Sequence, residues 1–189
     1  MDNDTTTPPH GSPLDLLYRL AYRTAYRLLR LWWRLRRPRV SGAGVAIWCD
    51  GRVLAVRTSY RGDLLDLPGG GVGRGETAEA AAVRELREEV GIAVPVGVLR
   101  PGGVFELMLD GRRITDTVFE WSPDALPVPR IDRREIVWAG WLTREELAGR
   151  PLAAGLAAYL DQGIGAGEGT RIMVWGDGRI STPPSKPTG

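Results

Sequence analysis

The sequence has very little of the side-chain chemistry that many enzymes use. Among its 189 residues there is one cysteine, Cys49, and one histidine, His10, which lies in a polar, proline-containing start. A single cysteine excludes an intramolecular disulfide and a cysteine-based zinc site. A single histidine in such a segment argues against Ser-His-Asp, Cys-His and histidine–metal chemistry. Any catalysis therefore has to rely on carboxylates, arginine, tyrosine or backbone groups.

Long apolar runs are also missing, and none reaches the roughly 18 residues of a membrane span. The apolar stretch near the start is interrupted by arginine every three or four residues, so it is not typical of a secretory signal. We expect a reducing cytoplasm as the compartment. Apolar residues (43%) and charged residues (25%) are close to globular averages, which predicts one folded domain with a core.

Positive charge is concentrated near the start of the chain. The formal net charge is +2, but residues 14–39 carry eight arginines and one acid, which gives +7 there and leaves −5 elsewhere. We predict disorder over 1–12 and a basic amphipathic helix over 13–38, begun by Ser12 as N-cap and ended by Pro38. Six of its arginines fall within an arc of about 80° on an ideal helix.

Three partners suit this helix. It would lie on an anionic membrane at its cytoplasmic face, pack on its own domain or a second subunit, or bind nucleic acid. A mostly apolar helix with a narrow basic stripe is a poor phosphate-binding surface, so nucleic acid is disfavoured. The membrane and packing interpretations stay open at this point.

From residue 40 onwards, the pattern indicates strands mixed with helices in an α/β domain. Asp50-Gly51 and Asp110-Gly111 are hairpin turn signals. A glycine-rich linker begins near residue 163 and precedes a further small hairpin around 171–178 and a loose tail. The expected strands are 44–48, 52–58, 94–99, 104–109, 113–121 and 136–142, and the expected helices are 77–90, 145–147 and 152–160. A short apolar stretch over 64–67 leads into Pro68 and three glycines.

The most informative stretch is a glycine-rich loop that leads into an acidic helix over residues 70–92. Glu85, Glu88 and Glu89 have the spacing i, i+3, i+4 and share one helix face. Three clustered carboxylates repel one another, and a divalent cation would reverse the sign of that interaction. Because the ligands available are oxygens alone, the pattern favours Mg²⁺ or Mn²⁺. On spacing alone, however, a solvated face with pairs such as Arg84–Glu88 is the more usual explanation.

The full pattern is far more specific than the spacing. Gly70, five residues, Glu76, seven residues and then Arg84-Glu85-Leu86-x-Glu88-Glu89-x-Gly91-Ile92 match the Nudix box at every defined position. The chain therefore resembles the Nudix hydrolase family over about residues 40–163, with residues 164–189 as linker, hairpin and tail. This resemblance implies an α/β/α sandwich with a mixed sheet, here preceded by the amphipathic helix.

The resemblance also implies an activity and a set of site residues. Family members hydrolyse a diphosphate linked to another moiety, commonly nucleotidic, with Mg²⁺ or Mn²⁺. Carried onto this sequence, the metal ligands would be the three glutamates 85, 88 and 89 with the carbonyl of Gly69. Arg84 would pair with Glu76 and orient the carboxylates, and Gly91 would end the helix, while Gly70 opens the box. The expected substrate is a (d)NTP or nucleotide derivative, and the alternatives are ADP-ribose or sugar-nucleotide cleavage and a non-catalytic nucleotide-binding module.

A further glutamate outside the box often takes part in this family. Glu135, just before the strand expected at 136–142, is the first candidate, and Glu120 is its rival. Phe105, Trp121, Trp138 or Trp141 would be able to stack on a base. Their strand context makes ordinary core packing the more usual role for each of these rings.

Overall fold

The computed structural model describes residues 16–18, 20–22, 24–25, 28, 40–95, 97–109, 112–162, 170–176 and 179–181. The start predicted to be disordered, the Asp110-Gly111 turn, the glycine-rich linker and residues 182–189 of the tail lie outside these residues. The described part of the segment predicted over 13–38 is helical. Within the described ranges, no helix has both the length and the apolar character needed to cross a membrane.

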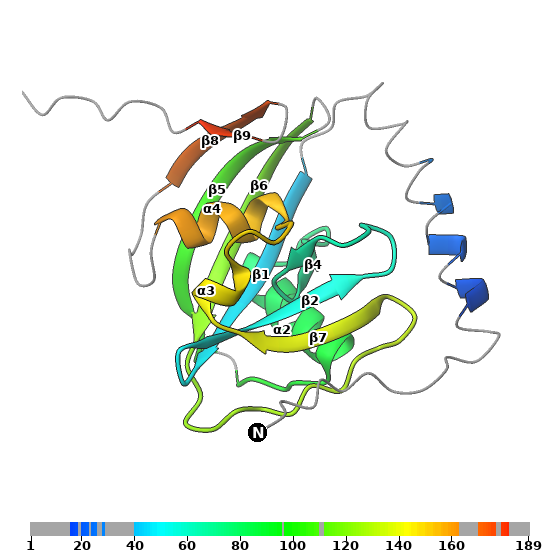
Figure 1. The fold of residues 1–189 in the computed structure, drawn as a ribbon, viewed down its shortest axis with the longest axis vertical. Helices are drawn as coiled ribbons and strands as arrows, with labels where there is room; N and C mark the ends of the chain where they lie inside the picture. The colour runs from blue at the N-terminus through cyan, green and yellow to red at the C-terminus, as the bar shows by residue number, and fades with distance from the viewer. Residues whose placement is uncertain are drawn as a thin grey trace, which may run out of the picture.

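The described strands form one mixed sheet in which β1 is central (Figure 1). The main order is β3-β2-β1-β6-β5-β8-β9, with β4 paired to β1 and β7 paired to β2. The β1–β6 and β5–β8 pairs are parallel and the remaining pairs are antiparallel. The strands are β1 (Val40–Cys49), β2 (Arg52–Thr58), β3 (Leu65–Asp66), β4 (Gly69–Gly71), β5 (Arg100–Leu109), β6 (Arg112–Trp121), β7 (Ile136–Leu142), β8 (Thr170–Gly176) and β9 (Arg179–Ser181).

Helices cover both faces of this sheet. Helix α2 (Ala78–Val90) lies behind it in Figure 1, and α3 (Arg144–Leu147) and α4 (Ala154–Gln162) lie in front. Alternate residues of β1 point to opposite faces, as the two-residue repeat of a strand requires. Val45 and Ile47 pack with Leu86 of α2, whereas Ala46 packs in the core of α4. The expected α/β/α sandwich is confirmed.

The ends of α2 follow from its sequence. The Thr77 side chain accepts a hydrogen bond from the Ala80 N–H at 3.1 Å and so satisfies one of the unpaired amides of the first turn. Gly91 adopts a left-handed conformation (φ +66°), which ends the helix as the sequence predicted. The box helix is therefore fixed at both ends.

One predicted strand is absent, and the strands expected to form hairpins pair antiparallel. Of the strand predicted over 94–99, residues 94–95 and 97–99 are irregular, because Pro95 has no N–H to donate and Gly97 turns the chain with φ +85°. The Asp50-Gly51 turn joins β1 to β2 with positive φ at both residues, as predicted. Near the end of the described chain, β8 and β9 form the small hairpin expected around 171–178, which adds to the edge of the sheet beside β5.

Candidate active site

The site lies where β4 passes over the acidic side of α2. Glu89 is only 4% exposed, and Glu85 is also largely buried, with its side chain 14% exposed. Glu88 is the outermost of the three, with 60% of its side chain exposed. The helix therefore holds two carboxylates against the sheet and one at the rim.

Glu89 is bound to the glycine strand. Its Oε2 accepts a hydrogen bond from the Gly69 N–H at 2.8 Å. Burial raises the pKa of the Glu89 carboxyl well above its usual range, and nearby Glu135, Glu85 and Asp66 raise it further. Among the described residues, no ion pair involves Glu89. Its negative charge is therefore costly in this position unless a cation accompanies it.

Gly70 leaves room for Glu85. A β-carbon at position 70 would collide with the Glu85 carboxylate, so only glycine allows this close approach of strand and helix. Burial is the main cause that raises the pKa of the Glu85 carboxyl, and the hydrogen bond from Arg84 opposes it. The contact between β4 and α2 at Glu85 therefore requires glycine at position 70.

Arg84 connects the loop to the helix as the sequence predicted. Its Nε donates to Glu76 Oε1 at 2.9 Å and its Nη2 donates to Glu76 Oε2 at 3.1 Å, which is a two-point pair. The same guanidinium donates from Nη1 to Glu85 Oε1 at 2.6 Å and to Glu88 Oε2 at 3.3 Å, and from Nη2 to the Gly71 carbonyl at 3.1 Å. These bonds lower the pKa of the Glu76 carboxyl and raise that of the Arg84 guanidinium.

Glu135 joins this cluster through the loop that precedes β7. The Arg130 N–H donates to the Val90 carbonyl at 2.7 Å and the Asp132 N–H donates to the Glu89 carbonyl at 2.9 Å. These bonds fasten the loop to the last turn of α2. As a result the charge of Glu135 raises the pKa of both Glu85 and Glu89.

The rival carboxylate, Glu120, lies in a different environment. It accepts a hydrogen bond from the Tyr159 hydroxyl at 2.6 Å, and that hydroxyl accepts one from Trp48 at 2.8 Å. Tyr159 belongs to the core on the α4 face, away from α2. Of the two candidates, Glu135 is the one that the structure brings to the box helix.

No preassembled metal cage is present in the described part of the chain. No group of three or more histidine, cysteine, aspartate or glutamate side chains there is arranged to hold a metal ion. In this structure Arg84 donates to one oxygen of Glu85 and one of Glu88, and the Gly69 amide donates to one oxygen of Glu89. The donor set nevertheless fits a hard divalent cation, because it consists of carboxylate oxygens with a buried, uncompensated charge among them.

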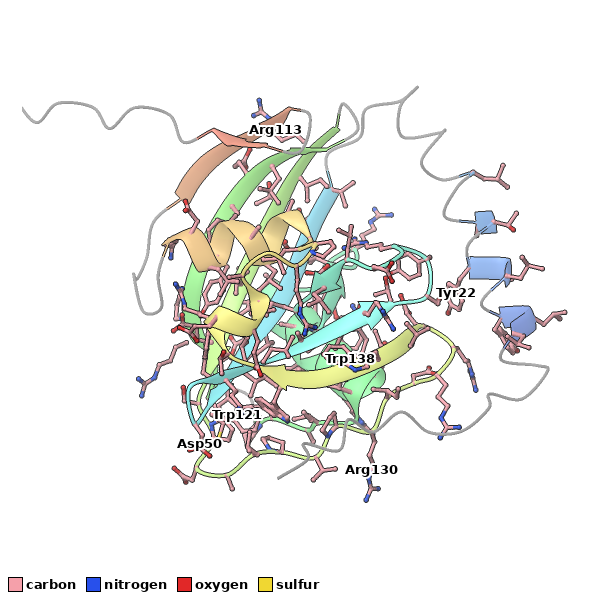
Figure 2. All side chains as sticks on the ribbon, viewed as in Figure 1. Tyr22, Asp50, Arg113, Trp121, Arg130 and Trp138 are labelled. Carbon is pink, nitrogen blue, oxygen red and sulfur yellow. The ribbon has the colours of Figure 1, made fainter. Side chains whose placement is uncertain are left out.

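The aromatic candidates belong to the two cores. Phe105 is fully buried on the α4 face, and Trp138 packs against the same core with its ring over Gly140. Trp121 and Trp141 pack against the α2 core, and Figure 2 shows Trp121 and Trp138 in separate places on the sheet. The packing role expected from their strand context is confirmed.

Sequence reasoning missed Tyr60. Its hydroxyl donates to Glu135 Oε1 at 2.8 Å although the two residues are 75 positions apart. Burial raises the pKa of the Tyr60 hydroxyl, and Glu135 raises it further, so the phenol stays protonated and remains a donor. No local pattern marks this residue, because the contact depends on how β2 pairs with β7.

A mixed sheet between helices, with a glycine strand over an acidic helix, defines a protein of the α/β/α sandwich class. The NUDIX domain model matches residues 38–162, and the chain belongs to the Nudix hydrolase family. It is 37% identical over 132 residues to a MutT-like protein of Streptomyces ambofaciens, which covers 70% of this chain and 81% of the relative.

Solved structures agree with this assignment. A MutT Nudix hydrolase from Burkholderia pseudomallei matches with a TM-score of 0.59 and 27% identity, over 67% of this chain and 98% of that one. A bifunctional NMN adenylyltransferase/ADP ribose pyrophosphatase from Francisella tularensis matches with a TM-score of 0.58 and 23% identity, over 79% of this chain and 47% of that one. At that identity, the second likeness concerns the fold alone.

Proposed function

We propose that this Nudix hydrolase cleaves the diphosphate linkage of a nucleotide-type substrate, a (d)NTP or nucleotide derivative, with Mg²⁺ or Mn²⁺. The observation that carries the proposal is the buried Glu89. It lies beside Glu85 and Glu135 with no ion pair among the described residues, and a divalent cation would balance this negative charge.

Each residue of the cluster has a distinct role in this proposal. The carboxylates of Glu85, Glu88 and Glu89, with the carbonyl of Gly69, would hold the cation. The cation, when bound, neutralises the charge of the diphosphate oxygens. Arg84 keeps the box carboxylates in place through its pair with Glu76.

Glu135 has the role of proton acceptor. It lies beside the box glutamates and takes the proton of the attacking water as the new P–O bond forms. The bridging P–O bond breaks in the same displacement, and the leaving phosphate group departs with the bridging oxygen. Its backbone is anchored by the loop that is bonded to α2, and its carboxylate by Tyr60. Glu120 serves as the comparison, because it faces the other core.

The test is release of phosphate or pyrophosphate from a panel of nucleotides with Mg²⁺ and with Mn²⁺. Glu88→Gln, Glu89→Gln and Glu135→Gln are each expected to lose most of the rate, by about 100-fold for a lost proton acceptor. Glu120→Gln is the matched control and should retain activity. Unchanged turnover in both Glu88→Gln and Glu89→Gln would contradict the site assignment.

The same panel separates the alternatives. Preferential cleavage of ADP-ribose or a sugar nucleotide would assign the chain to that activity, which the Francisella neighbour carries in its name. Tight nucleotide binding without turnover across the whole panel would indicate a binding module that retains the fold. Turnover of triphosphates supports the proposal as stated.

For the N-terminal segment we propose contact with an anionic membrane. Leu16, Leu17, Leu20 and Leu28 are all more than 60% exposed, and on an ideal helix they fall within an arc of about 120°. Arginines at 19, 23, 27 and 30 are interspersed among them in the sequence. Exposed leucines with adjacent arginines match the interface of an anionic bilayer.

Liposome flotation tests this contact. The full chain and a chain without residues 1–38 are compared on vesicles with and without an anionic lipid. Flotation of the full chain alone, and only with the anionic lipid, is expected. Equal flotation of both chains would rule the proposal out, and dimer formation that depends on residues 1–38 would assign the leucines to a second subunit instead.

A further inference from the structure

Glu135, at the end of the loop before β7, is held by the loop after β2. The Ser59 N–H donates to the Glu135 carbonyl at 2.7 Å, and the Ser59 hydroxyl donates to the Arg134 carbonyl at 3.4 Å. The next residue, Tyr60, reaches the Glu135 side chain with its hydroxyl at 2.8 Å. The loop after β2 therefore fixes both the backbone and the carboxylate of Glu135.

The N-terminal segment contacts the same two loops. Tyr22 stacks on Tyr60, with ring centroids 6.4 Å apart and an interplanar angle of 24°. One turn earlier, the Tyr18 ring receives the guanidinium of Arg134 at 5.4 Å from its centroid. Figure 2 shows Tyr22 on the side of the helical segment that faces the domain.

These contacts use a different side of the helix from the exposed leucines. Tyr18 and Tyr22 are four residues apart and share one side, and on an ideal helix the four leucines lie on the opposite side. Tyr18 thus contacts Arg134, the residue before Glu135. Tyr22 contacts Tyr60, which donates a hydrogen bond to Glu135.

We propose that Tyr60 is a positioning residue for Glu135, and that Tyr22 holds the Tyr60 ring in the orientation this requires. The N-terminal segment then acts on the active site indirectly, through Tyr60. Tyr60 donates a hydrogen bond that orients the carboxylate, and it does not touch the reacting atoms itself. The inference rests on the proposed function, in which Glu135 accepts the proton of water.

The first test is kinetic. Tyr60→Phe keeps the ring and removes the hydroxyl, so kcat should fall about tenfold with little change in KM. Tyr22→Ala should cause a similar fall. Tyr22→Phe keeps the stacked ring, so its kcat should stay near the wild-type value. Thr24→Ala, an exposed position on the same helical segment, is the control and should leave kcat unchanged.

The second test asks whether the effect passes through Glu135. In a Glu135→Gln background, Tyr60→Phe and Tyr22→Ala should cause no further loss, because residues that act as one unit are not additive. A loss by the same factor in both backgrounds would show a general effect on the fold and would overturn the proposal. A fall in Tyr22→Phe as large as that in Tyr22→Ala would overturn the role of stacking.

Urea unfolding of the metal-free protein gives a readout without activity. Double-mutant cycles for Tyr22 with Tyr60, and for Tyr60 with Glu135, should both show coupling, and additive effects in both would overturn the proposal. Full activity of Glu135→Gln would instead disprove the proton-acceptor role in the proposed function. Lack of turnover with every nucleotide would disprove that function while these unfolding cycles still tested the geometry.

Discussion

The carboxylate of Glu89 accepts a 2.8 Å hydrogen bond from the Gly69 N–H, which ties the fourth turn of α2 to β4. The bond favours the ionised carboxylate, whereas its burial favours the neutral form. Glu89 is thus a fixed carboxyl group without a positive partner among the described residues, and its negative charge is costly unless a cation binds. This relationship leads to the first prediction.

Mg²⁺ or Mn²⁺ should stabilise the folded chain, because a cation that binds only the native state raises its stability. At 100 times the Kd the gain is about 2.7 kcal/mol. Thermal unfolding with and without the cation measures it. Glu89→Gln should lose most of the gain, and Glu79→Gln, on the first turn of the same helix, should keep it. An equal gain in both variants would place the cation elsewhere.

Gly70→Ala should reduce activity more than stability. The added methyl group collides with the Glu85 carboxylate, and this flexible end of a side chain moves aside without unfolding the protein. A displaced ligand of this kind costs up to about 100-fold in rate. Gly71→Ala is the matched control, since a β-carbon there meets no atom within 4 Å. Rate assays and thermal unfolding of both variants check the prediction, and equal activity in the two would contradict it.

Arg84→Lys should lower kcat/KM by about tenfold because lysine cannot reproduce the two-point pair with Glu76. Its single ammonium also cannot reach Glu85 and the Gly71 carbonyl at the same time. Arg87→Lys, an exposed neighbour on the same helix, is the control. Steady-state kinetics on the best substrate of the panel distinguishes the two, and wild-type rates in Arg84→Lys would show that charge alone suffices.

The free energy of unfolding should depend on pH through Asp116, which lies on β6 facing Gly155 of α4. Burial raises the pKa of its carboxyl to about 6, above the unfolded value of about 3.9. The raised pKa means that the fold favours the neutral carboxyl. The contribution of Asp116 to the free energy of unfolding is therefore full below about pH 4 and is lost as the pH rises through 6. The loss is at most about 3 kcal/mol.

Asp116→Asn removes this ionisation. The variant should therefore be more stable than the parent chain at pH 8 and gain nothing at pH 3.5. Urea unfolding at the two pH values measures the difference in the free energy of unfolding. A stabilisation that is the same at both values would show that Asp116 does not carry the effect.

The sequence predicted the parts of the site that lie close together along the chain. Thr77 and Gly91 limit α2 by local capping, and Arg84 pairs with Glu76 because the loop brings them together. Glu135 was predicted from its place before the last strand of the domain. Tyr60 was not, because its contact with Glu135 arises from the pairing of β2 with β7.

The expectation that residues 94–99 form a strand was wrong for a related reason. Val94 and Leu99 are buried, so the apolar signal reported burial correctly, but it did not report backbone pairing. Pro95 and the left-handed Gly97 decided the backbone conformation there.

The parallel pairing of β8 with residues 104–107 of β5 has a practical consequence. Without that hairpin, β5 would be an edge strand with unpaired backbone amides and carbonyls, which can pair with a strand of another molecule. A chain shortened to residues 38–162, although it keeps every box residue, would accordingly be prone to self-association at high concentration.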